Sequence, residues 1–182
     1  HPADVERLRM ALLDMAHLEG FNRSAQDVTL TRLLQFGLAP VLKQNFEEIQ
    51  RAPYLARLAL VEIANDQTTL FFRVNYDGHF ETFKHGAVIG GHQKMVEWVD
   101  KEIRKKPFAT YSLTQTLREV CGLWEQGIKQ IGENEGDGTP KTLKEAFEDW
   151  VIEGAVLCNS TLRKSIYRPL SEQEIEKLKT LF

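Results

Sequence analysis

The sequence predicts an α+β fold, in which helices and antiparallel strands follow one another in separate blocks. Apolar residues recur at helical spacing over residues 3–49. Residues 55–88 are instead rich in β-branched and aromatic side chains and contain an Asp-Gly turn. Helical spacing returns after Gly90-Gly91, and a capping box opens a last helix at Ser171. The expected order is helix, helix, three strands, helix, helix, two strands, helix.

Length and composition indicate one globular domain over residues 1–182. The net charge of −3 offers no basic surface, so we expect neither a nucleic acid partner nor a membrane surface. Apolar runs are short, and none approaches the roughly 20 residues that span a bilayer. Cys121 and Cys158 lie in apolar segments far apart in the sequence, which predicts buried thiols in a reducing compartment.

The first block predicts two helices. Residues 3–18 have one apolar face, and a second, longer helix is expected to be capped by Asp27. Gly37 and Pro40 lie inside the second helix, so we expect a kink or a break at residues 36–40. The inward face of the second helix would carry Leu30, Leu33, Leu34, Leu38, Val41, Leu42, Phe46 and Ile49.

The second block predicts an antiparallel meander. Leu55 to Ala64, Thr68 to Tyr76 and His79 to Val88 each have the composition of a strand. Asn65 to Gln67 is a turn, and Asp77-Gly78 is a strong hairpin signal because such a turn needs positive φ. Three consecutive strands with short turns form a meander.

Two glycines then predict a sharp corner, because glycine tolerates backbone angles that other residues avoid. Gly90-Gly91 precedes a helix over residues 93–104. Ser112 begins another helix that reaches about Ile131. Residues 132–140 are polar, acidic and glycine-rich, which is typical of a solvated loop.

The last block predicts a hairpin followed by a helix. Residues 141–150 are weakly helical. Strands over 151–158 and 162–167 would pair across residues 159–161. Ser171 and Glu174 have the spacing of a capping box, which predicts the start of the final helix.

Other candidate chemical sites have simpler interpretations. His79, His85 and His92 follow at spacings of six and seven residues, but isolated histidines in strands usually pack or face solvent, so we expect no metal and no cofactor. Arg73 and His79 have a spacing used by helical ribonucleases, yet this stretch predicts a hairpin. Cys121 lies on an apolar helix face, which favours a place in the core over a nucleophilic role.

Four short motifs occur in an informative order along nearly the whole chain. They are Pro2-Ala3-Asp4 before the first helix, Arg51-Ala52-Pro53-Tyr54 before the first strand, Asp77-Gly78 followed by Phe80, Lys84, Ala87 and Gly90-Gly91-His92, and Leu170-Ser171 followed by Glu174-Ile175-Glu176. In this order they resemble the proteasome core-subunit family of the N-terminal nucleophile hydrolase superfamily. Each motif is short, and the resemblance rests on their agreement in order.

The resemblance implies a four-layer αββα sandwich, with two antiparallel sheets between two helix layers. Members open with two strands before the first helix, so this chain would be the C-terminal three quarters of a full subunit. The implied function is a structural component of a barrel-shaped protein-degradation complex, which forms the ring and gates access to its chamber. The opening of the C-terminal helix favours an α-type role over a β-type one. Val5 to Met15 and Leu30 to Ile49 would then bear ring contacts.

The implied partners are homologous subunits in a homo-oligomeric or hetero-oligomeric ring of seven, a regulatory particle, and unfolded polypeptide substrates. Such complexes work in the cytoplasm, and in the nucleus as well if the source is eukaryotic.

The residues of the family's chemistry are not found in this chain, so we predict no catalytic residue. Active members begin with a threonine that acts as nucleophile, with its free amine as base; that position would precede His1. The corner at Gly90 and Gly91 places His92 where active members have serine, and residues 136–139 only faintly match their Asp-x-x-Ser-Gly-Gly segment. One alternative is a threonine-type peptidase whose nucleophile precedes His1. Another is a free-standing scaffold without catalysis.

Overall fold

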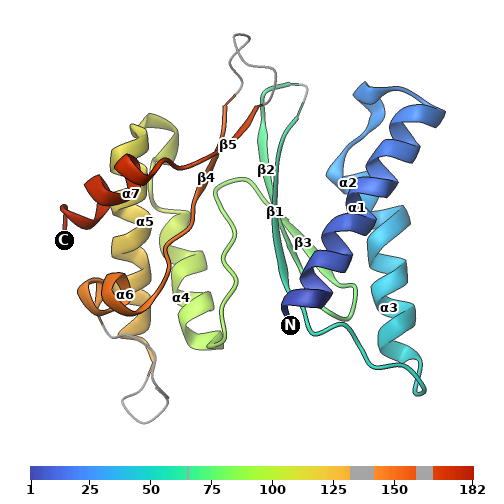
Figure 1. The fold of residues 1–182 in the computed structure, drawn as a ribbon, viewed down its shortest axis with the longest axis horizontal. Coiled ribbons are helices and arrows are strands. Elements are labelled where there is room, and N and C mark those ends of the chain that lie inside the picture. The colour runs from blue at the N-terminus through green and yellow to red at the C-terminus, as the bar shows by residue number, and fades with distance from the viewer. Residues whose placement is uncertain (65, 132–141, 159–165) are drawn as a thin grey trace. The chain divides into compact units, whose positions relative to one another are not determined.

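The computed structural model describes residues 1–64, 66–131, 142–158 and 166–182. The chain divides into two compact units, His1–Ile89 (unit 1) and Gly90–Phe182 (unit 2). Helices occur in both units, and each unit has one small antiparallel sheet (Figure 1). The α+β class predicted from the sequence is therefore confirmed. The single domain inferred from chain length stays a prediction.

Unit 1 begins with two antiparallel helical segments that lie on one side of its sheet (Figure 1). The second segment changes geometry at the position where a kink was predicted, because a π-helix replaces regular α-helix there. Pro40 follows in the first turn of the next helix, where its missing N–H costs least. The elements are α1 (Pro2–Asn22), the short 3₁₀ turn η1 (Ala25–Asp27), α2 (Leu30–Arg32), the π-helix η2 (Leu33–Leu38) and α3 (Ala39–Glu47).

The predicted cap of the second helical segment is wrong. Asp27 lies inside η1, where its carboxylate accepts a hydrogen bond from the Ser24 hydroxyl at 3.0 Å. The N-cap of α2 is Thr29, whose hydroxyl accepts from the Arg32 backbone N–H at 3.3 Å. The extra 3₁₀ turn moves the start of the helix past the aspartate.

The predicted meander is confirmed. Strands β1 (Leu58–Ile63), β2 (Thr69–Val74) and β3 (Phe80–Phe83) form an antiparallel sheet in the order β1-β2-β3. β3 is shorter than predicted, because the chain leaves the ladder after Phe83 and Gly86 adopts a positive φ of 147°.

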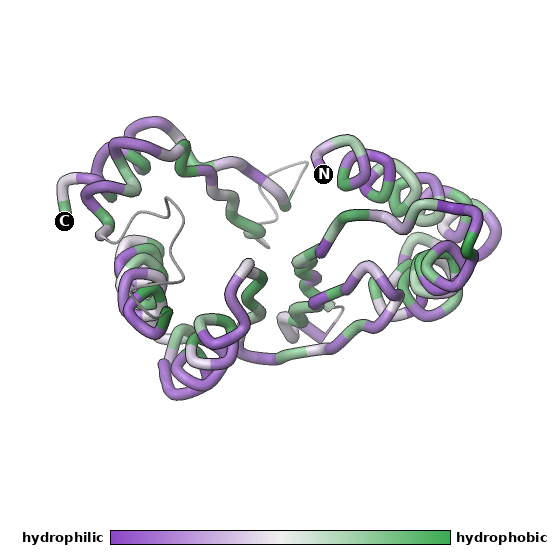
Figure 2. The backbone as a smooth tube through the Cα atoms, turned by 90° about the horizontal axis from the view of Figure 1, so that it is seen from below, coloured by the Kyte–Doolittle hydropathy of each residue, from purple (hydrophilic) through white to green (hydrophobic). Residues whose placement is uncertain are grey.

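One face of this sheet forms the core of unit 1 with the helices. The sheet members of the core cluster are Leu58, Leu60, Leu70, Phe72, Val74 and Phe80. They lie on one face of the sheet, because paired residues share a face and successive side chains along a strand point to opposite faces. Leu34, Leu38 and Leu42 of the second helical segment are fully buried against them. The alternation of polar and apolar residues along these helices is visible in Figure 2.

The second face of the sheet combines apolar side chains with the ion pair of Arg73 and Glu81. It carries Val61, Ile63, Phe71 and Phe83, which alternate with the core residues along their strands. Val61 is 41% exposed. An antiparallel sheet that faces water on one side normally has polar residues there. With four large apolar side chains, this second face is more apolar than a face that is only solvated.

Unit 2 contains two longer helices, a small hairpin and two shorter helices. α5 begins with a capping box formed by Ser112 and Gln115. The predicted capping box of Ser171 and Glu174 is confirmed at the start of the last helix. The elements are α4 (Gln93–Ile103), the 3₁₀ turn η3 (Phe108–Thr110), α5 (Leu113–Ile128), α6 (Leu143–Asp149), β4 (Ala155–Leu157), β5 (Tyr167–Pro169) and α7 (Glu172–Lys179).

The hairpin of unit 2 differs from its prediction. β4 and β5 pair antiparallel with Val156 opposite Arg168; β5 begins at Tyr167 and extends beyond the predicted end to Pro169, while residues 162–165 of the predicted strand lie outside the described residues. Its predicted turn at 159–161, the loop at 132–140 and Asn65 of the earlier turn lie outside the described residues.

Small residues let the elements of unit 2 approach closely. A methyl group on Gly127 of α5 would lie 2.9 Å from Val99 Cγ2 of α4. The Val99 side chain therefore packs directly against the backbone of α5 at this glycine. Trp124 and Trp150 meet edge to face with ring centroids 6.0 Å apart.

In the part of the chain that the structure describes, no helix is long and apolar enough to cross a bilayer.

The capping box of α7 is reinforced by an ion pair, which gives a pH prediction. Arg168 donates two hydrogen bonds of 2.9 Å to the two carboxylate oxygens of Glu174, and the Ser171 backbone N–H donates another of 2.9 Å. These bonds lower the pKa of Glu174 to about 2, and those from Arg168 contribute most to the shift. Its stabilising contribution is therefore present above the pKa of an unfolded glutamate and is lost as the pH falls towards 2.

A carboxyl ¹³C NMR titration should give Glu174 a pKa of about 2. In Arg168→Gln the pKa should move back towards the ordinary value of glutamate. A wild-type Glu174 that titrates like a solvated glutamate would contradict the hydrogen bonds from Arg168 and Ser171.

Candidate functional site

The hairpin turn predicted from Asp77-Gly78 is a tight and well-defined structure. The Asp77 carboxylate accepts a hydrogen bond from the His79 backbone N–H at 2.9 Å, and Gly78 has a φ of 83°. A methyl group on Gly78 would lie only 2.4 Å from the Ala39 carbonyl oxygen of α3. The turn is thus pressed against the backbone of α3, and it has a structural role in joining sheet to helix.

The predicted glycine corner leads into α4 without forming a polar site. The chain bends at Gly91, and neither Gly90 nor Gly91 has a left-handed φ. A methyl group on Gly90 would lie 3.3 Å from Val96 Cγ2. His92 is the N-cap residue of α4, but its side chain makes no capping hydrogen bond. The corner is a packed helix start.

Arg73 holds the segment that approaches this corner. Its guanidinium donates to Glu81 on the adjacent strand at 2.7 Å and to the Val88 carbonyl at 3.3 Å. It also lies 4.9 Å from the centre of the Phe83 ring. The geometry is that of a cross-strand pair on the second face of the sheet, and this stretch is a hairpin as predicted.

The remaining candidate side chains are dispersed. His79 and His85 are exposed and lie just outside β3. Among the described residues, no three His, Cys, Asp or Glu side chains gather in a way that could hold a metal ion. Cys121 is half-buried, and its burial raises the pKa of the thiol, which disfavours the reactive thiolate. The prediction that Cys158 is buried is wrong, because it is exposed at the end of the short strand β4.

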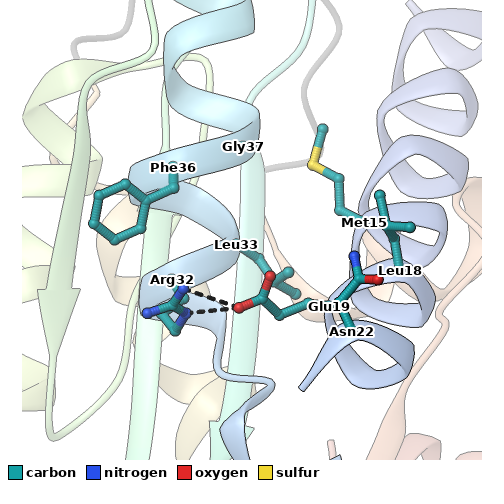
Figure 3. Close-up of a pocket in the computed structure, with 8 residues that line it drawn as sticks. All are labelled: Met15, Leu18, Glu19, Asn22, Arg32, Leu33, Phe36 and Gly37. Atoms are coloured by element: carbon teal, nitrogen blue, oxygen red, sulfur yellow. Dashed lines mark hydrogen bonds and ion pairs between the residues drawn. The ribbon is translucent and has the colours of Figure 1, made fainter. Parts of the chain in front are cut away.

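Sequence patterns did not predict a pocket that the structure describes in unit 1. A pocket of about 180 Å³ lies between the second half of α1 and the segment formed by α2 and η2 (Figure 3). Its apolar lining comes from Met15, Leu18, Leu33 and Phe36. Gly37 belongs to the lining as well, and a methyl group there would lie 2.6 Å from the Met15 sulfur. The sequence signal for this close approach is a glycine within an apolar helical segment, and Gly37 lies in the π-helix η2.

The polar side of the pocket is formed by Glu19 and Arg32, which are joined by an ion pair. One carboxylate oxygen of Glu19 accepts from Arg32 Nε at 3.0 Å and also lies 3.0 Å from Arg23 Nε. Arg32 Nη2 lies 2.9 Å from the same oxygen, and its guanidinium stacks 5.5 Å from the Phe36 ring centre. Two guanidinium groups thus share one carboxylate beside the pocket mouth. We call this group the arginine rim.

Two apolar side chains that line the pocket are exposed, and α1 carries further exposed apolar residues. Leu18 is 63% exposed, Phe36 is 68% exposed and Phe21, at the end of α1, is 88% exposed. Met10 and Leu13 are further exposed apolar residues on α1. Clustered apolar exposure with a charged rim is typical of a protein-binding surface.

A second polar contact ties the helix layer to the sheet. Glu62 of β1 lies on the core face of the sheet, and the Leu30 backbone N–H at the start of α2 donates to its two oxygens at 3.2 and 3.3 Å. Burial raises the pKa of Glu62, although the hydrogen bond from Leu30 opposes this shift. The carboxylate thus caps a helix from the neighbouring strand and is partly desolvated there.

Glu62→Gln is expected to leave unit 1 as stable as before, or up to about 1 kcal/mol more stable, at neutral pH. The amide keeps an acceptor for Leu30 and removes a partly buried charge. Because the folded-state pKa of Glu62 is raised, the cost of its charge is absent below the unfolded pKa and develops as the pH rises through the folded pKa. The difference in unfolding free energy between the wild type and Glu62→Gln should therefore shrink towards about pH 4.

Urea unfolding at several pH values measures this difference directly. Glu62→Leu, which removes the acceptor, is the matched control and should lose about 1 kcal/mol. A Glu62→Gln variant that becomes less stable than the wild type as the pH rises would contradict the partly desolvated charge assigned to Glu62.

No known family model matches the chain, and no curated protein matches it either.

Proposed function

We propose that this chain is a proteasome-like subunit with a four-layer αββα fold, and that it is a ring-forming structural component of a barrel-shaped protein-degradation complex. The observation that carries the proposal is the meander β1–β3, whose second face carries four large apolar side chains beside the Arg73–Glu81 ion pair. One face packs on α1, α2 and α3. The other offers Val61, Ile63, Phe71 and Phe83 to a further layer, which in this fold is a second sheet.

The order of elements supports the same proposal. Two helical segments, a three-stranded meander, two helices, a hairpin and a capped terminal helix follow one another as the resemblance implies. The additional short helix α6 precedes the hairpin. The capping box of Ser171 and Glu174 stands where the α-type terminal helix would begin. An α-type role is therefore preferred.

A structural role fits the chemistry of the corner better than a catalytic one. Active relatives would place a serine where this chain has His92, which begins α4 and makes no capping bond. The exposed apolar residues of α1 and η2 provide surface for neighbouring subunits. In this proposal the partners are homologous subunits, a regulatory particle and unfolded polypeptides, and the complex works in the cytoplasm.

Sedimentation velocity of the intact protein, together with a fluorogenic peptide assay, tests the proposal. We expect a discrete species several times heavier than the 20.9 kDa of this chain, without peptide cleavage by the purified homo-oligomer. Cleavage that depends on a processed N-terminal threonine would instead establish the threonine-type peptidase. A stable monomer at all concentrations would contradict ring formation.

A further inference from the structure

We propose that α1 packs antiparallel against α1 of a second copy of this chain, through the helix face that points away from the core of unit 1. The residues of this face follow one another at spacings of three or four, so they lie in one row along the helix. They are Glu6, Met10, Leu13, His17 and Phe21, and all five are exposed. We call this row the α1 stripe.

Helix α1 carries apolar residues on two opposite faces. Leu8 and Leu12 are buried in the core of unit 1. On the α1 stripe, Met10 is 46% exposed, Leu13 is 41% exposed and Phe21 is 88% exposed. The outer face of a helix that meets only water normally carries charged and polar residues. A row of exposed apolar side chains therefore indicates a face that a partner covers.

The charges beside the α1 stripe select a second copy as that partner. Arg7 and Asp14 are seven residues apart, so they flank the stripe on the same side. Arg7 lies 5.8 Å from the centre of the Tyr54 ring, but within the described part of the chain neither Arg7 nor Asp14 belongs to an ion pair. A twofold axis perpendicular to the helices brings Arg7 of each copy to Asp14 of the other. Two ion pairs that the single chain lacks therefore form across the contact.

The same register matches the residues of the stripe itself. When Met10 faces Leu13 of the other copy, Glu6 faces His17. Phe21, the largest side chain of the stripe, then lies beside Ala3, which is small and exposed. Apolar residues thus meet apolar residues, and polar residues meet polar ones. A parallel pair would instead set Glu6 against Glu6 of the other copy, with like charges opposed.

The contact does not depend on the proposed ring. It is isologous, so two copies suffice to form it and to close it. If the ring forms, the same contact joins two rings. Loss of the contact therefore halves the mass of the assembled species, whether that species is a dimer or a pair of rings.

Charge reversal, measured by sedimentation velocity on the intact protein, tests the contact. Arg7→Glu and Asp14→Arg each oppose like charges, and each should weaken the association by about tenfold or more. The double variant exchanges the two charges and should restore the association. Leu13→Asp should halve the mass, whereas Val41→Asp, at a similarly exposed position on α3, should leave the α1 contact intact. Circular dichroism of each variant shows whether it is folded.

Disulfide trapping determines the direction of the two helices. In a background with Cys121→Ser and Cys158→Ser, mixing Ala3→Cys with Phe21→Cys should give a disulfide-linked dimer. Phe21→Cys alone is the control and should not cross-link, because the two Phe21 positions lie about 28 Å apart along the antiparallel pair at a rise of 1.5 Å per residue. A cross-link through Phe21→Cys alone would overturn the antiparallel contact.

The outcomes for the contact and for the proposed function are distinguishable. Rings whose mass neither Arg7→Glu nor Asp14→Arg changes would overturn the contact and leave the proposed function standing. A dimer that either reversal dissociates and the double variant restores would support the contact and count against the ring. A protein that stays monomeric at all concentrations would overturn both.

Discussion

Gly78→Ala is expected to destabilise unit 1 by about 2–5 kcal/mol. Two costs add at this position. An alanine must adopt the left-handed φ of 83°, and its methyl group must find room 2.4 Å from the Ala39 carbonyl oxygen and 3.0 Å from the Lys43 backbone nitrogen. Both obstructing atoms belong to the backbone of α3, so relief requires moving a helix. Urea or thermal unfolding measures the loss.

Gly91→Ala is the matched control for this prediction. A methyl group on Gly91 meets nothing within 4 Å, and its φ is not left-handed. The unfolding free energy of the Gly91→Ala variant should differ from that of the wild type by less than about 0.5 kcal/mol. Equal stability of the two variants would show that the hairpin does not pack against α3.

Phe72→Ala is the second variant with a large expected effect, a loss of about 3–5 kcal/mol. Phe72 is the largest of the fully buried side chains and lies on the central strand β2, opposite Leu60 and Thr82. Removing the ring leaves a cavity between sheet and helices that Leu34 and Leu38 cannot fill without moving.

Phe21→Ala removes the same group from a side chain that is 88% exposed at the end of α1. Its unfolding free energy should change by less than about 1 kcal/mol. If the two alanine variants lost the same stability, Phe72 would not be the centre of the core.

Local sequence signals predicted most of the elements correctly. The Asp77-Gly78 turn and the capping box of Ser171 and Glu174 work through neighbours in the chain, so their residue types suffice to predict them. Asp27 shows where this fails: it can cap a helix as well as Thr29 can, and the inserted 3₁₀ turn decides between them. Strand ends were less predictable, because β3 ends where the chain leaves β2 and not where its composition changes.

The candidate site depended on contacts that a linear pattern does not contain. Gly78 was expected in a turn, but its approach to Ala39 joins elements about forty residues apart. The pocket is lined by residues of α1 together with residues of α2 and η2, so it depends on how these segments pack. Cys158 was placed in the core from its apolar neighbours, yet the short edge of a two-stranded sheet leaves it exposed.

The most direct test of the proteasome-like assignment is an electron cryo-microscopy structure of the intact protein. We predict rings of subunits in which a second antiparallel sheet covers the face that carries Val61, Phe71 and Phe83, with α1 and α3 on the opposite side of β1–β3. A monomeric particle in which that face is covered by helices, or is open to solvent, would contradict the assignment.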